Sequence, residues 1–187
     1  MNDSQQQPRR GGISSSMITA LAAGVVSLSA LAVSIYEAYL MREQQAASVL
    51  PIIDFWAAYN PGESYSLNLA NKGLGPAFMK HIEVLVDGDS HRNWISVTEA
   101  MTGSRVALNE SALIGSVLAP GEVNTMLSIA DAEDGTAVWR QADRIQLNVC
   151  YCSVFENCWT TSVTNLNTGS PTTQAIDACP QADNVIF

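Results

Sequence analysis

The sequence predicts a mainly β protein, an antiparallel β-sandwich preceded by one N-terminal transmembrane α-helix. No charged side chain occurs from Ile13 to Tyr36. At about 1.5 Å of rise per residue, a helix of this length crosses a hydrocarbon core of about 30 Å. Beyond Pro51, about seven short strand-like segments follow at roughly ten-residue spacing with turn residues between them, which is typical of two packed antiparallel sheets.

The charges that flank the apolar run indicate its direction. Arg9 and Arg10 precede it, whereas Glu37, Arg42 and Glu43 follow it and sum to one negative charge. Positive flanks stay in the cytoplasm, so we expect a single-pass signal-anchor protein of the inner (cytoplasmic) membrane. Its N-terminus would lie in the cytoplasm and its C-terminal domain in the periplasm or extracellular space. The alternative is a cleaved signal peptide with a small-x-small site at residues 30–32, which delivers the domain to the same compartment.

Four parts are predicted along the chain. They are a disordered cytoplasmic tail (residues 1–12), a transmembrane helix (residues 13–40), a helical stalk (residues 41–50) and an extracytoplasmic β domain (residues 51–187). Serines inside the span can donate to their own helix backbone. Ala20 and Gly24 form a small-xxx-small pair that would let two such helices approach, so homo-oligomerisation stays open.

The charge balance excludes one class of partner. The formal net charge is −9, and fifteen acidic but only six basic residues follow Glu43. Nucleic acids require a basic surface, and anionic lipid headgroups require a polybasic segment. We therefore expect no nucleic-acid partner, and contact with the membrane only through residues 13–40.

Alternation of apolar and polar residues, with turn residues between segments, indicates the strands of the domain. Expected strands are 52–59, 65–69, 78–86 and a short one at Trp94, Ile95 and Val97. Residues 116–118 and 124–130 are expected to form a hairpin around Pro120-Gly121. A polar loop over residues 131–143 would hold a short helix carrying Trp139. A second hairpin is expected to pair residues 146–153 with residues 158–163.

All four cysteines lie in the last quarter of the chain, as Cys150, Cys152, Cys158 and Cys179. An even number on the oxidising side of a membrane predicts two structural disulfides, for which three pairings are open. The hairpin brings Cys152 and Cys158 together at its mouth, which leaves Cys150 to pair with Cys179. The alternatives are a redox-active Cys150-x-Cys152 pair and a zinc site.

The remaining polar residues predict no active site. His81 and His91, the only histidines, lack metal-ligand spacing and are expected to be ordinary strand or surface residues. The acidic segment at residues 131–135 does not fit the spacing of a calcium loop, and the four tryptophans are expected in the core. We predict no catalytic, cofactor-binding or metal-binding residue, and no cofactor.

Two segments carry a resemblance to a known class of domain. Residues 66–77, which include Asn71, Gly73, Gly75 and Pro76, are followed by a strand that ends at Asp87-Gly88, and a Pro-Gly turn follows at residues 118–122. This pattern resembles bacterial immunoglobulin-like modules, such as the cell-adhesion-related domain, and implies an immunoglobulin-like β-sandwich. The anchor and the Cys-x-Cys hairpin also resemble uncharacterised small bacterial membrane proteins. The cysteine hairpin itself departs from the adhesion-module pattern.

These observations lead to two hypotheses about function. The first is a non-enzymatic, membrane-anchored module outside the cytoplasm, an accessory subunit that binds or braces another membrane or envelope protein. The second is a thiol-redox enzyme or sensor that uses the Cys150/Cys152 pair.

Overall fold

The computed structural model describes residues 14–181 and residue 187. The chain divides into two units, residues 1–45 and residues 46–187. The predicted tail at residues 1–12 lies outside the described residues. Helix α1 (Ser15–Ser48) is 34 residues long, has no buried residue, and is apolar and long enough to cross a membrane. The predicted stalk thus continues the same helix as far as Ser48.

Polar side chains inside α1 are satisfied within the helix. The hydroxyl of Ser27 donates to the carbonyl oxygen of Ala23 at 2.7 Å, and that of Ser29 donates to the carbonyl oxygen of Val25 at 2.9 Å. Because these hydroxyls need no partner outside the helix, the serines do not prevent an apolar environment around it.

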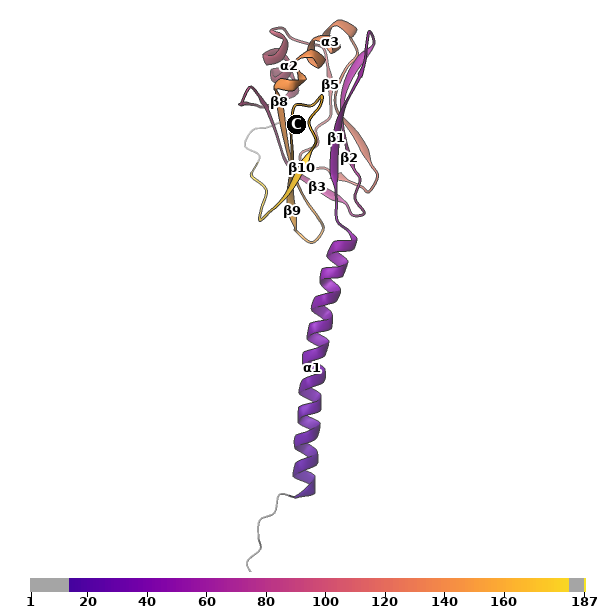
Figure 1. Ribbon diagram of the computed structural model, residues 1–187, viewed down its shortest axis with the longest axis vertical. Coiled ribbons are helices and arrows are strands. Elements are labelled where there is room, and N and C mark those ends of the chain that lie inside the picture. Colours follow the sequence, from indigo (N-terminus) through magenta and orange to yellow (C-terminus); the bar gives the residue numbers. More distant parts are fainter. Residues whose placement is uncertain (1–13, 182–186) are drawn as a thin grey trace, which may run out of the picture. The chain divides into compact units, whose positions relative to one another are not determined.

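The second unit contains two antiparallel sheets (Figure 1). One sheet has the strand order β1-β2-β7-β5, and the other has the order β10-β9-β8-β3-β4 with β6 paired to β3. The strands are β1 (Ile53–Asn60), β2 (Ser64–Asn71), β3 (Ala77–Val86), β4 (Asp89–His91), β5 (Asn109–Glu110), β6 (Val117–Leu118), β7 (Val123–Ile129), β8 (Ile145–Cys152), β9 (Cys158–Thr164) and β10 (Thr172–Ile176). Inward-facing side chains of both sheets form one buried core.

The coarse prediction of mainly antiparallel sheet after one long apolar helix is therefore confirmed. The immunoglobulin-like assignment stays a prediction. The strand prediction is wrong in several places, and the short strands β4 and β5 are not among the predicted strands. Residues 116–118 and 124–130 form no hairpin, because β6 pairs with β3 in one sheet while β7 pairs with β2 and β5 in the other. Strand β10 was not predicted.

The predicted short strand at Trp94, Ile95 and Val97 is also wrong, because this segment begins helix α2 (Trp94–Thr102). The side chain of Asn93 caps the helix by accepting from the backbone N–H of Ser96 at 2.8 Å. Gly103 ends it in the left-handed conformation, with φ of 75°. Buried residues recur on one face with helical spacing, at Trp94, Val97, Thr98 and Met101.

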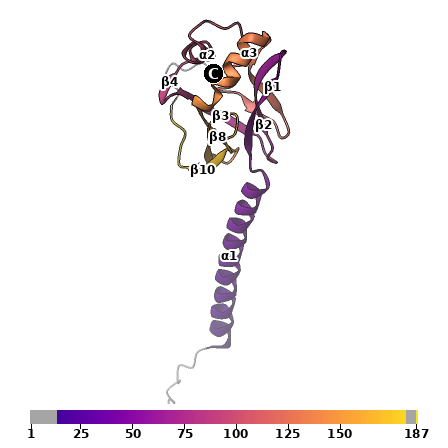
Figure 2. The same ribbon diagram turned by 45° about the horizontal axis from the view of Figure 1, so that its top comes forward.

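A second short helix, α3 (Ala132–Arg140), occupies the acidic segment and confirms the helix predicted around Trp139. The carboxylate of Asp131 accepts from the backbone N–H groups of Glu133 and Asp134, at 2.9 and 3.0 Å. The acidic residues thus cap the helix and complement its N-terminal dipole. Helices α2 and α3 lie side by side at one end of this unit in both views (Figures 1 and 2).

Strand β8 carries two of the cysteines, and Arg144 directly precedes it. The guanidinium forms an ion pair with Asp87 at the end of β3 and also donates to the carbonyl oxygen of Met101 at 3.4 Å. The hydrogen bond from Arg144 lowers the pKa of the Asp87 carboxyl below its ordinary value. This contact ties the beginning of β8 to the end of β3, its neighbour in the sheet.

Asn71, at the end of β2, is the most completely bonded polar side chain of the domain. It is fully buried. Its Oδ1 accepts from the N–H groups of Ile52 at 3.2 Å and Gly73 at 3.0 Å. Its Nδ2 donates to the carbonyl oxygens of Gly75 at 2.7 Å and Leu118 at 3.1 Å. An asparagine amide has two donor hydrogens and an acceptor oxygen with two lone pairs, so its whole capacity is used.

Gly73 and Gly75, which follow Asn71, lie where there is no space for a side chain. A Cβ on Gly73 would lie 2.3 Å from the carbonyl oxygen of Leu50, and a Cβ on Gly75 would lie 1.8 Å from that of Val49. Residues 72–76 therefore press directly on the backbone that leads into β1. Pro76 closes this loop, and β3 starts at the next residue. The four motif residues act together to join β2, β3 and the entry of the domain.

We predict that Asn71→Ala destabilises the domain by about 3 kcal/mol or more, because several buried backbone groups lose their partners. Asn68→Ala is the matched control, since Asn68 lies in the same strand but is only half-buried, and should cost less than about 1 kcal/mol. Urea unfolding of the full chain in detergent, followed by tryptophan fluorescence, measures both. Equal losses for the two variants would contradict the central role of Asn71.

Candidate functional site

The cysteines gather on the outer face of the six-stranded sheet because side chains alternate along β8. Leu147, Val149 and Tyr151 point into the core, and Cys150 and Cys152 therefore share the opposite face. Both are nevertheless nearly inaccessible, with 2% and 7% of their surface exposed. The segment that follows β10 lies over this face, because its Cys179 is bonded to Cys150.

The four sulfurs form two bonds. Cys152 and Cys158 are direct cross-strand partners in β8 and β9, with their Cα atoms 4.0 Å apart, and they are joined by a disulfide. Cys150 is joined to Cys179, with 29 residues of sequence separation. These are the same pairs that the predicted hairpin favours. Cys150 and Cys152, the pair of the redox hypothesis, thus belong to different bonds, and the described chain has no free cysteine.

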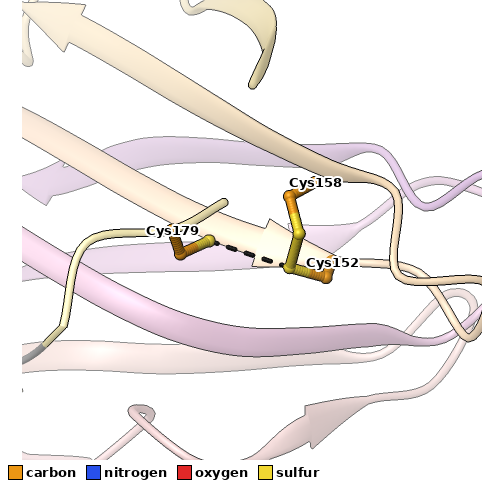
Figure 3. A group of neighbouring side chains, drawn as sticks. All are labelled: Cys152, Cys158 and Cys179. Carbon is orange, nitrogen blue, oxygen red and sulfur yellow. Dashed lines mark hydrogen bonds between the residues drawn. A yellow bond between two sulfur atoms is a disulfide. The ribbon is translucent and has the colours of Figure 1, made fainter. Parts of the chain in front are cut away.

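The two bonds lie in contact with each other. The Sγ atoms of Cys152 and Cys179 are 3.8 Å apart, although they are not bonded to each other (Figure 3). Both sulfurs are already in disulfides and carry no hydrogen, so this is a van der Waals contact and not a hydrogen bond. Three sulfurs, those of Cys152, Cys158 and Cys179, lie within 4.8 Å of one another.

This cluster also bears on the metal alternative. Zinc is bound by thiolates, and a sulfur in a disulfide is not one. The three clustered sulfurs would become a candidate ligand set only after both bonds were reduced. His81 and His91 are not part of the cluster.

A β-bulge in β3 brings basic residues to the same face. The register of β3 against β8 shifts between Met79 and His81, so Lys80 is the extra residue. Met79 stays in the core, while Lys80 is exposed and His81 lies opposite Cys150. Bulges commonly redirect side chains next to functional sites.

His81 is more than the ordinary strand residue expected from the sequence. Its Nδ1 atom is buried and has no hydrogen-bond partner among the described residues. A buried, unpartnered ring nitrogen is uncommon because losing its contact with water is unfavourable. His91, by contrast, lies at the end of β4, away from the cysteines.

Two neighbouring hollows open over the cluster. The larger, of about 680 Å³, is lined by three of the cysteines together with Lys80, Glu156 and Asp177. The smaller, of about 370 Å³, is lined by Cys150 with His81, Glu83 and Asn148. Pro180 borders both, so the segment that carries Cys179 separates them.

The tryptophans divide between core and surface. Trp94 is buried against Phe187, and Trp139 stacks on Tyr59 with ring centroids 5.0 Å apart. Trp159 packs against Tyr151, but Trp56 on β1 is 38% exposed. Core packing thus accounts for three of the four, and Trp56 departs from the expectation.

Lys80 and His81 were not expected to be neighbours of the cysteines. They lie about seventy residues earlier in the chain, so no local spacing connects them. The one available signal was two consecutive basic residues inside an apolar strand, which is irregular for strict alternation. A bulge explains that irregularity.

No model of a known protein family matches this chain, and no curated protein is significantly similar to it. Functional inference therefore depends on the described residues themselves.

The two bonds should differ in their contribution to stability. Paired serine substitutions of Cys150 and Cys179 release the larger loop and should cost about 3.5 kcal/mol, against about 2 kcal/mol for Cys152 with Cys158. Urea unfolding of the full chain in detergent measures both losses, with the unsubstituted protein as reference. The opposite order would show that strain or packing, and not loop closure, governs these bonds.

Proposed function

We propose that this protein is a single-pass protein of the cytoplasmic membrane whose β-rich domain works outside the cytoplasm as a non-enzymatic binding module for another envelope protein. The observation that carries the proposal is the combination, in one chain, of a 34-residue apolar helix without buried residues and two disulfides in the following domain. Disulfides persist on the oxidising side of a membrane.

The length of α1 supports a tether that ends beyond the lipid. Its 34 residues correspond to about 51 Å, which exceeds a hydrocarbon core of about 30 Å. The predicted span ends at residue 40, so residues 41–48 would extend as a stalk of about 12 Å. The arginine pair before the run supports a cytoplasmic N-terminus.

A binding role is supported by the outer face of the four-stranded sheet. Trp56 lies there opposite Asn68, which in turn lies opposite Thr125. The small polar groups bond to one another: the hydroxyl of Thr125 donates to Asn68 at 2.9 Å, and Asn68 donates to Ser66 at 3.1 Å. The result is an ordered polar surface on which one large aromatic side chain is exposed.

A cation adjoins this tryptophan. The ammonium of Lys72 lies 5.8 Å from the centroid of the Trp56 ring and forms an ion pair with Asp54. Tryptophan is enriched among the residues that dominate protein–protein affinity. An immunoglobulin-like sandwich presenting one sheet face to a partner would fit this arrangement.

Topology is tested by protease treatment of intact spheroplasts carrying an N-terminal epitope tag. We expect the full chain to be shortened to a membrane-embedded fragment that keeps the tag, while a cytoplasmic marker protein stays intact. A full-length chain that is cleaved only after lysis would contradict the proposed orientation. Recovery of the untreated, full-length chain in the soluble fraction would contradict the anchor.

The binding face is tested by photo-crosslinking in cells. A photoreactive amino acid at position 56 should give a discrete adduct with a different protein, whereas the same group at position 154 should not. Val154 is a suitable control because it is 49% exposed but lies in the β8–β9 turn. Equal labelling at both positions, or an adduct made only of two copies of this chain, would contradict the proposed partner.

A further inference from the structure

The Cys179 sulfur lies between two possible bonding partners. It is bonded to Cys150, and the Sγ of Cys152 is in contact with it at 3.8 Å. We propose that Cys152 and Cys179 form a thiol–disulfide exchange pair, which gives the domain two disulfide isomers that differ in the anchoring of its C-terminal segment. This inference stands on the sulfur geometry alone and does not depend on the proposed binding role.

The exchange starts when an external dithiol reductant opens the Cys152–Cys158 bond. The dithiol is oxidised to its own disulfide, and its two electrons and two protons leave Cys152 and Cys158 as thiols. Deprotonated Cys152 then attacks Sγ of Cys179, forming a Cys152–Cys179 bond and breaking Cys150–Cys179. Cys150 leaves as a thiolate and takes up a proton, so the second step is an isomerisation without further oxidant or reductant.

Both sulfurs of the Cys152–Cys158 bond line the larger hollow of about 680 Å³, so a reductant in this hollow can reach the bond from either sulfur. In the other bond, Cys179 lines the same hollow, whereas Cys150 lines only the smaller one of about 370 Å³. Opening of Cys152–Cys158 is the step that starts the exchange, because it frees the sulfur in contact with Cys179. The bond closes a short loop, with six residues of separation, and the two strands remain hydrogen-bonded along β8 and β9 without it. The sheet can therefore hold its register while Cys152 is a free thiol.

The β3 bulge places one basic residue near the attacking sulfur, that of Cys152, and another near the leaving sulfur, that of Cys150. Lys80 lines the hollow that contains Cys152, and a nearby cation favours a thiolate. The carboxylates of Glu156 and Asp177 line the same hollow, and Lys80 offsets part of their negative field. His81 lies opposite Cys150, with its unpartnered Nδ1 available to the leaving thiolate.

Exchange would move residues 177–181, the segment that carries Cys179. Cys150 and Cys152 are two residues apart on one strand, so the attachment point of Cys179 shifts by about 7 Å along β8. Pro180 now separates the two hollows, and this shift would uncover the one lined by His81, Glu83 and Asn148. The chemical state of the cysteines would thereby control a polar surface on the outer face of the sheet.

Disulfide mapping of the full chain in detergent tests the exchange. The folded protein is treated with limiting dithiothreitol, quenched with acid, alkylated, digested with pepsin and analysed by tandem mass spectrometry. We expect peptides linked through Cys152–Cys179, with Cys150 and Cys158 alkylated. Recovery of only the two original bonds and fully reduced chains would overturn the proposal, and so would an equal yield of this isomer from protein unfolded in guanidinium.

Two matched variants test the identity of the attacking thiol without any reductant. Cys158→Ser leaves Cys152 free beside Cys150–Cys179, and Cys152→Ser leaves Cys158 free instead. The first variant should equilibrate to contain the Cys152–Cys179 isomer, at least about tenfold more than Cys158–Cys179 in the second. The Sγ of Cys152 is in contact with that of Cys179 at 3.8 Å, whereas the three clustered sulfurs, that of Cys158 included, are only within 4.8 Å of one another. Comparable exchange in both would overturn the assignment, and the wild-type mapping decides the matter if either variant fails to fold.

Discussion

One buried amide organises the domain. Asn71 lies at the end of β2 in the four-stranded sheet, yet it donates to Leu118 of β6, which is paired with the other sheet. It also binds the backbone of Ile52, just before β1, and of Gly75, just before β3. Burying any of these polar groups without a hydrogen-bond partner would cost free energy. A single side chain therefore holds both sheets and the entry of the chain in one arrangement.

The cysteine cluster is a consequence of the order of the strands in the six-stranded sheet. Because β3 and β9 flank β8, the outer face presents three adjacent columns of side chains. The register places Cys158 opposite Cys152 and His81 opposite Cys150. Residues 177–181 then cross these columns and are attached to the sheet through Cys179. This attachment buries sulfurs that would otherwise be exposed. The two disulfides, the bulge and the two hollows thus lie on one face of the sheet, where β3, β8 and β9 are neighbours.

The helix and the domain contribute to function in different ways. Helix α1 carries no charged side chain as far as Tyr36, and none of its residues is buried, which suits a lipid environment. The domain has its own core and offers water a polar surface. An exposed tryptophan on one sheet and a sulfur cluster on the other give its two outer faces distinct chemistry. The first face fits recognition of a partner, and the second fits control by thiol chemistry.

Local patterns in the sequence suffice to predict the apolar helix, most strands, the β8–β9 hairpin and the two cysteine pairs that this hairpin favours. These features depend on local periodicity, on turn residues and on neighbours a few positions apart. The capped helix at Trp94 was also readable, from Asn93, Gly103 and the helical spacing between them, but its apolar residues were interpreted as a strand. The folded structure was needed to show that β6 and β7 belong to different sheets and that Lys80 and His81 lie beside the cysteines. Those relations come from pairing between distant strands and from a one-residue bulge, because burial of a shared core, which no local pattern encodes, selects them.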